Sequence, residues 1–297
     1  MVSRNTPTRF AVFSLVAGTL ILAAKMFAWW LTGSAAILAD ALESVVNVIA
    51  AAVAVFATHV AAQPLDADHP YGHGKVELLS AAFEGGAIAA AALGILWSGG
   101  RALLWPPGLR HLDIGMGVSV AAAAANAGLG LLLLRAGKVH NSEALRADGQ
   151  HVLSDVWTSV GALAGVALAW GTGVERLDGT AAVLTGLALA WHGVAILRRA
   201  MDGLMDAEDP EFVARVRAAF EHARVPGVHG LHRVRAIRSG TFVHVDAHIR
   251  VPGDWTVQQA HAVGTALEEA MKRETGITGE FALHMDPWSP PPHASVQ

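Results

Sequence analysis

Two short polar segments interrupt long apolar runs of this chain, and both carry side chains that can bind a metal ion. Glu43 and Asn47 lie four residues apart in the first segment, and His151 and Asp155 lie four residues apart in the second. Residues at this spacing share one face of a helix. If the two faces meet, they form a four-ligand cage that predicts a divalent-metal site.

The apolar surroundings of these groups favour a site inside a membrane. The chain has 297 residues, of which 53% are hydrophobic and 15% charged, whereas soluble domains are roughly 25% charged. Ionisable groups at membrane depth are costly and usually mark an ion or substrate path. A single polar residue there would more simply make an interhelical hydrogen bond, but two matched pairs favour a transport path.

Six apolar segments are long enough to cross a bilayer, which takes roughly 20 residues per helix. They cover residues 10–31, 35–59, 78–104, 112–134, 147–171 and 178–197. Lys25, within the first segment, is expected to snorkel or to pair with an acid. The other polar residues of the spans, for which structural hydrogen bonds are the expected role, are Asp40, Glu84, Asn126 and Asp148.

Charge and histidine dominate after residue 205, where helix and strand signals follow the order αββαβ. We expect a linker at 200–208, and Asp209 should cap the helix that opens at Pro210. The expected elements are helices at 210–223 and 256–274 and strands at 229–238, 241–250 and 278–285. The fold class is therefore an all-α six-helix transmembrane domain (1–205) plus a small cytoplasmic α+β, metallochaperone-like domain (206–297).

Basic residues in short loops predict the orientation of the spans, because cytoplasmic loops are enriched in Lys and Arg. Three basic residues fall on one side of the membrane: Arg101, Arg110 and Arg176. The other side holds the larger set, Arg4, Arg9, Lys75, Arg135, Lys138, Arg146, Arg198 and Arg199. Both termini are therefore expected in the cytoplasm.

Composition limits the kinds of partner and metal. The chain has no cysteine, so neither a disulfide nor a thiolate metal site can form. The donors that remain are His, Asp, Glu and Asn, which suit Zn, Mn, Fe, Co or Ni better than Cu(I). The net charge of −4 gives no sign of nucleic-acid binding.

Three motifs resemble, in the right order, parts of the cation diffusion facilitator family. SAAILADALES (34–44) is similar to its second span, DADHPYGHGK (66–75) to the loop that follows, and LRADGQHVLSD (145–155) to its fifth span. The resemblance implies a homodimeric efflux transporter of bacterial zinc/iron type, not an enzyme. It would sit in the inner membrane and export divalent metal, most often Zn²⁺, in exchange for protons.

The resemblance also implies a transport site at Glu43, Asn47, His151 and Asp155. The family's second-span pair is commonly two Asp or His and Asp, so Glu43 and Asn47 are a departure. Two carboxylates still neutralise a divalent ion, and the oxygen-rich set suggests Mn²⁺ or Fe²⁺ beside Zn²⁺. Cd²⁺, Co²⁺ and Ni²⁺ are further ions that such a transporter would export. His151 must be deprotonated to bind metal, which predicts coupling to protons.

Further sites are expected outside the spans. Asp66, His69 and His73 match a loop metal site of the family, with a solvated polar turn as the alternative. A two-metal cytoplasmic site near the dimer interface is implied at His232, His248, His261, His284 and Asp286. His244 shares a strand face with His248 but matches no family ligand, so we expect it at the surface.

Lys75 and Asp206 match a family ion pair that holds the dimer near the membrane–cytoplasm junction. Two other functions remain open. A metal sensor or structural membrane partner of the same fold would transport poorly because Asn47 weakens the cage. A membrane metalloenzyme would need an open coordination position facing a substrate cleft, and the motifs argue against it.

Overall fold

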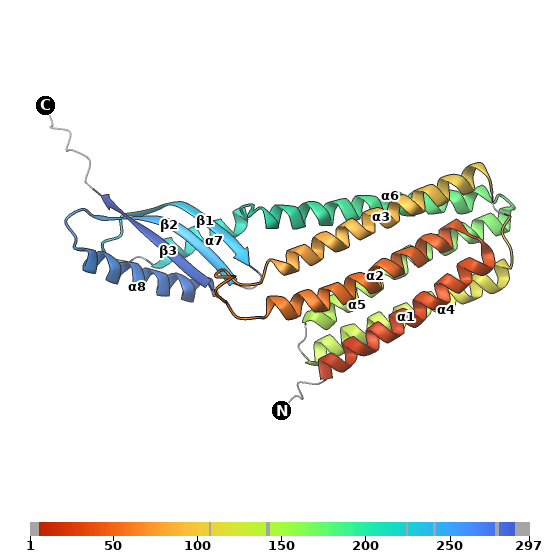
Figure 1. Cartoon of the computed structure of the whole chain (residues 1–297), viewed down its shortest axis with the longest axis horizontal. Coiled ribbons are helices and arrows are strands. Elements are labelled where there is room, and N and C mark those ends of the chain that lie inside the picture. The colour runs from red at the N-terminus through yellow and green to blue at the C-terminus, as the bar shows by residue number, and fades with distance from the viewer. Residues whose placement is uncertain are drawn as a thin grey trace. The chain divides into compact units, whose positions relative to one another are not determined.

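The computed structural model describes residues 6–106, 108–140, 143–223, 225–239, 242–276 and 279–288. Long helices come first, followed by two helices and three strands in the order αββαβ (Figure 1). The long helices are α1 (Thr6–Thr32), α2 (Ala35–Ala61), α3 (Val76–Leu104), α4 (Leu112–His140), α5 (Glu143–Thr172) and α6 (Arg176–Leu204). The remaining elements are α7 (Pro210–Ala223), β1 (Gly230–Ser239), β2 (Phe242–Pro252), α8 (Val257–Thr275) and β3 (Gly279–Trp288). The fold class expected from the sequence is confirmed.

Six helices of the described chain are long and apolar enough to cross a membrane. They extend beyond the apolar segments, and α6 continues to Leu204, so the linker expected at 200–208 begins only at residue 205. Ala, Met and Leu are strong helix formers, and the helix ends only where Asp206 takes a left-handed φ of 58°. Arg4, used above for orientation, lies outside the described residues.

The chain divides into two compact units. Residues 1–55 and 80–198 form one, which we name the helical unit, and residues 56–79 and 199–297 form the other, the C-terminal unit. The loop between α2 and α3 therefore belongs with the C-terminal residues. Each unit is described by itself.

Within the helical unit, α3 and α6 approach backbone to backbone. A Cβ atom added to Gly85 would lie 2.7 Å from the Leu197 amide nitrogen and 2.8 Å from the Gly193 carbonyl oxygen. Gly193 is equally crowded, because its Cβ would lie 2.8 Å from the Ala89 amide nitrogen. Small residues at such crossings allow the van der Waals packing that drives helix association in lipid.

The first turn of α2 is capped by a residue of another helix. Asp178 of α6 accepts hydrogen bonds from the Ala35 and Ala36 backbone amides at 2.7 and 3.2 Å, and from the Ser34 hydroxyl. Asp178 is fully buried. Because orphan amides at a helix start need a partner, this carboxylate fixes the entry of α2, the helix that carries Glu43 and Asn47.

The strands form one sheet in the order β1-β2-β3, with β1 antiparallel and β3 parallel to β2. Alternate residues of β2, including Val245 and Ile249, are buried in a core shared with α7 and α8. His244 and His248 have the opposite parity and therefore lie on the sheet face away from this core. The expected cap of α7 is confirmed, since the Phe212 amide donates to Asp209 at 3.0 Å.

The close approach of α3 and α6 gives a prediction with a neighbouring control. Gly85→Ala should lower the free energy of unfolding by about 1–3 kcal/mol, the usual cost of overpacking, because its methyl group meets backbone atoms. Gly86→Ala, whose Cβ would meet nothing within 4 Å, should change it by about 0.5 kcal/mol or less. Thermal unfolding in detergent measures both, and equal melting temperatures for the two variants would contradict the packing described.

Candidate metal sites

The expected transmembrane ligands on α2 and α5 lie against one another. The Asn47 amide donates to Asp155 Oδ2 at 2.8 Å. Glu43 lies close enough to Asp155 for the two carboxyl groups to interact electrostatically. Its Oε2 atom is buried and has no hydrogen-bond partner. Three of the four expected ligands therefore share one polar contact between two helices.

His151, the fourth expected ligand, stands at the edge of this contact. It lies one turn before Asp155 and interacts with it electrostatically, but its side chain is exposed. Among the described residues, Glu43, His151 and Asp155 do not form a group whose ligand atoms lie within 4.8 Å of one another. The structure brings the two helices together but does not close a four-ligand cage.

A buried cation lies next to this contact. Lys25 is 1% exposed, and its Nζ donates to Asp40 at 2.9 Å, to Ser44 at 3.0 Å and to Ser159 at 3.2 Å. The expected pairing of Lys25 with an acid is confirmed. Removing one partner of a buried ion pair typically costs about 3–5 kcal/mol, so the pair is integral to the helical unit. We name Lys25, Asp40, Ser44 and Ser159 the Lys25 network.

Sequence reasoning missed the two serines of the Lys25 network. A signal was present, because Ser44 lies four residues after Asp40 and Ser159 four residues after Asp155, each on the same helix face as an acid. Asp148 has the structural role expected for it, since it accepts a hydrogen bond from Ser14 at 2.9 Å.

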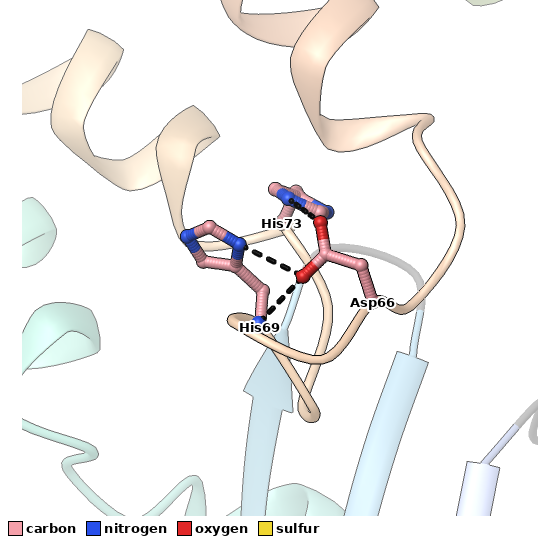
Figure 2. A group of neighbouring side chains, drawn as sticks. All are labelled: Asp66, His69 and His73. Carbon is pink, nitrogen blue, oxygen red and sulfur yellow. Dashed lines mark hydrogen bonds and ion pairs between the residues drawn. The ribbon is translucent and has the colours of Figure 1, made fainter.

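The loop residues Asp66, His69 and His73 form a compact group in which one ligand atom from each lies within 4.8 Å of the others. Figure 2 shows both imidazoles turned toward the Asp66 carboxylate, with His69 Nδ1 at 3.1 Å and His73 Nε2 at 3.4 Å. Gly72 has a φ of +83°, a conformation that glycine adopts readily, so it allows the tight turn between the histidines.

Hydrogen bonding keeps the Asp66 carboxylate charged. The His69 backbone amide donates to Asp66 at 2.6 Å and, with smaller contributions from the two imidazoles, lowers the pKa of Asp66 below its ordinary value. His73 is buried, whereas Asp66 and His69 are exposed. The loop thus holds a charged carboxylate, an exposed imidazole and a buried imidazole together, a donor set suited to a divalent transition metal.

A second group lies across the open face of the sheet. Asp286 Oδ2 lies 2.9 Å from His232 Nε2 and 3.1 Å from His248 Nδ1, and Asp286 Oδ1 lies 3.4 Å from His284 Nε2. The strand register explains the cluster, because His232 pairs with His248 and His248 with His284. The hydrogen bond from His248 is the main cause that lowers the pKa of Asp286.

His261, the fifth expected ligand of this site, is not brought to the cluster within one chain. It is exposed on α8, and α8 packs on the sheet face opposite to His248. His244 corrects another expectation, since it does not lie at the surface. Its side chain is 11% exposed, because Tyr71 packs edge-on against its ring at 5.0 Å between centroids.

Lys75 and Asp206 form the expected ion pair, with Lys75 Nζ at 2.8 and 3.0 Å from the two carboxylate oxygens. Asp206 follows the last turn of α6, where the Ala207 amide donates back to the Asp202 carbonyl. This position favours glycine, so the aspartate is held in a disfavoured backbone conformation while its side chain reaches Lys75.

Unpaired buried atoms coincide with the candidate sites. Five buried side-chain polar atoms of the described residues have no hydrogen-bond partner, on Glu43, His73, Ser119, His232 and His244. Buried polar groups are normally satisfied. Three of the five belong to expected ligands, one in each candidate site: Glu43 Oε2, His73 Nδ1 and His232 Nδ1. In both histidines the nitrogen that faces the carboxylate is the other one, Nε2, so their unpaired atoms are not the ones turned toward the other expected ligands.

Comparison with known proteins identifies the class of protein. The "Cation efflux transmembrane domain" family matches residues 11–205, and the "Cation efflux protein, cytoplasmic domain" family, whose short name ZT_dimer refers to dimerisation, matches residues 209–288. The chain therefore belongs to the cation efflux, or cation diffusion facilitator, family of integral membrane transporters, which are not enzymes.

Similar proteins cover almost the whole chain. "Uncharacterized transporter sll1263" of Synechocystis sp. is 39% identical over 95% of this chain and 91% of its own length. The "Cation-efflux pump FieF" of Pectobacterium atrosepticum is 30% identical over 96% and 94%, and that of Pectobacterium carotovorum is 31% identical over the same shares. The resemblance expected from the three motifs is confirmed.

The backbone of Asp206 gives one prediction. Asp206→Ala loses the ion pair and keeps the unfavourable φ, whereas Asp206→Gly loses the ion pair and relieves the backbone. The glycine variant should therefore be more stable than the alanine variant by about 1–2 kcal/mol, the cost of a left-handed non-glycine residue. Thermal unfolding of the full chain compares them, and an alanine variant at least as stable as the glycine variant would contradict the conformation described.

The charged state of the two carboxylates gives another prediction. Their lowered pKa values mean that Asp66 and Asp286 stabilise the folded state above the ordinary carboxyl pKa, a contribution lost as pH falls through the lowered value. The zinc affinity of a chain carrying Asp155→Ala, which lacks one of the expected transmembrane ligands, reports on the groups around these two carboxylates. Asp286→Asn should reduce this affinity by a similar factor from about pH 5 to about pH 8, because the lowered pKa keeps Asp286 charged over that range. If the loss of affinity disappears at the acidic end, Asp286 has become protonated there and the prediction is wrong.

Proposed function

We propose that this protein exports Zn²⁺ from the cytoplasm in exchange for protons, with Glu43, Asn47, His151 and Asp155 as its transport site. The observation that carries the proposal is the α2–α5 contact, where Asn47 meets Asp155 at 2.8 Å beside an unpaired buried oxygen of Glu43. The two FieF relatives, named as cation-efflux pumps, support the direction of transport.

Binding would rearrange two side chains. Asn47 now donates its amide N–H to Asp155, so it must rotate to offer its oxygen to an ion. His151 must turn from the exposed edge toward Asp155, and its imidazole must be neutral to bind, so metal binding releases a proton. Four such donors suit tetrahedral Zn²⁺, with Fe²⁺, Mn²⁺, Cd²⁺, Co²⁺ and Ni²⁺ as further candidate ions.

The C-terminal sites would bind cytoplasmic metal in a homodimer. Asp66, His69 and His73 form the proposed loop site, and the sheet cluster around Asp286 forms the proposed cytoplasmic site. His261, exposed on α8, would reach metal only in a dimer. A metal that bridges two protomers favours the conformation that it fits better.

The domain boundary and the membrane in which the protein lies follow from the same proposed function. We place the domain boundary between residues 205 and 206, with both termini in the cytoplasm of a bacterium and the helices in its inner membrane. The Lys75–Asp206 ion pair, 2.8 Å at its closest, would hold the dimer at the junction of the two domains.

One observation favours a second candidate, a metal sensor or structural membrane partner with weak transport. Both described groups of three ligands within 4.8 Å lie in the C-terminal unit, and neither lies in the spans. Zinc binding at these two groups without any uptake into vesicles would favour this second function.

The test is a panel of divalent ions in reconstituted vesicles with an imposed pH gradient. The wild type should take up Zn²⁺ faster when the gradient favours proton exchange, because each bound metal displaces a proton. Asp155→Ala should abolish uptake, and Asn47→Asp should raise the rank of Zn²⁺ by adding a charged donor. Uptake indifferent to the gradient removes the antiport, and an unchanged ranking in Asn47→Asp removes that residue from the site.

A further inference from the structure

The Lys25 network lies one helical turn from the proposed transport site on both ligand-bearing helices. Asp40 precedes Glu43 by three residues on α2, and Ser159 follows Asp155 by four on α5. The Ser159 hydroxyl donates to Asp40 at 2.6 Å. The same two helices are therefore joined at two neighbouring levels, once by Asn47 and Asp155 and once by the Lys25 network.

Helix α1 also contacts α5 on the other side of the proposed ligands. The Ser14 hydroxyl donates to Asp148, and Lys25 donates to Ser159, and both contacts join residues 134 positions apart in the chain. The equal separation means that α1 and α5 keep one register along the stretch that holds His151 and Asp155. Helix α1 thus spans the ligand-bearing part of α5 with a polar contact at each end.

Lys25 does not bind the transported ion, because its hydrogen bonds are all made within the Lys25 network. An ammonium group has three donors and no acceptor, and Asp40, Ser44 and Ser159 accept one hydrogen bond each. Lys25 and Asp40 also cancel each other's charge at 2.9 Å. The influence of the pair on a neighbouring ion is therefore mainly geometric, through the helices that it joins.

We propose that Lys25 is a positioning residue that fixes the spacing of α2 and α5 and thereby limits the size of ion that the transport site accepts. The proposal rests on the proposed function of Glu43, Asn47, His151 and Asp155. Zn²⁺ needs ligands at about 2.0–2.2 Å, whereas larger ions such as Cd²⁺ need longer bonds. A cage held at fixed spacing discriminates between them, and a cage free to widen does not.

The experiment replaces the ion pair without leaving a buried charge. Lys25→Met/Asp40→Leu substitutes apolar groups, a change that is often neutral or stabilising for a buried pair, so the melting temperature should be retained. The ratio of Zn²⁺ to Cd²⁺ transport efficiency in vesicles should fall at least about tenfold, the lower end of what pocket geometry contributes to discrimination. Thr19→Val is the matched control, because it removes an exposed hydroxyl of α1 that donates to the Leu15 carbonyl of the same helix.

A second readout is independent of transport. The chain has no cysteine, so Ala36→Cys and Ala162→Cys introduce one unambiguous pair into a packed cluster between α2 and α5. Oxidation by copper phenanthroline should form the disulfide readily in the wild-type background and several-fold more slowly with Lys25→Met/Asp40→Leu.

The two readouts separate this proposal from the function on which it rests. A wild type that takes up no ion refutes the proposed transport, while cross-linking still measures the spacing of α2 and α5. A stable double variant with unchanged ion discrimination overturns the role of Lys25, even if the wild type transports. Unchanged cross-linking in the double variant overturns it as well.

Discussion

A polar side chain inside a bilayer must find its partner within the protein, because the hydrocarbon offers none. The helical unit follows this constraint closely. Lys25 pairs with Asp40, Asn47 with Asp155, and Asp178 with the start of α2. The Asn47–Asp155 bond and the Asp178 cap join helices far apart in sequence, so they help to determine which helices are neighbours. Among the described residues of this unit, Glu43 Oε2 and Ser119 Oγ are buried and unpaired, and Glu43 lies where the ion is proposed to bind.

The C-terminal unit builds its candidate sites in another way. Strand register places three histidines side by side across the sheet, and a tight turn at Gly72 places two more around Asp66. The charged state of both carboxylates is favoured by hydrogen bonds. Because the imidazoles and carboxylates of each group already contact one another, the groups can be assembled before a metal arrives. The transmembrane ligands are less complete, since His151 remains exposed.

Much of the fold could be predicted because apolarity and periodicity are local properties. The six spans, the αββαβ order and the Asp209 cap follow from neighbouring residues. The end of α6 was wrong because the stop signal at Asp206 lies in its backbone conformation rather than in a glycine or proline. The expectation for His244 was wrong because two rings pack against it, Phe242 on the same strand and Tyr71 from a loop more than a hundred residues away in sequence.

Prediction of the candidate sites from the sequence has the same limit, because local patterns do not specify contacts between distant segments. Spacing placed Glu43, Asn47 and Asp155 on faces that do meet, and the motifs indicated the loop and sheet ligands. Spacing could not indicate Ser159 as a partner of Asp40 or Asp178 as the cap of α2, because each contact depends on how distant helices pack. His261 was predicted beside the other sheet ligands, but it lies on α8, which packs on the other face of the sheet, and its spacing in the sequence does not show on which face it lies.

The most direct test is zinc X-ray absorption on the full chain with its loop and sheet ligands removed, by His69→Ala, His73→Ala, His248→Ala and Asp286→Ala. The proposed site predicts one bound zinc with about four nitrogen and oxygen ligands at about 2.0–2.2 Å, including one imidazole that disappears in His151→Ala. A chain that retains no zinc, or a zinc spectrum unchanged by both His151→Ala and Asp155→Ala, would contradict a metal site between α2 and α5.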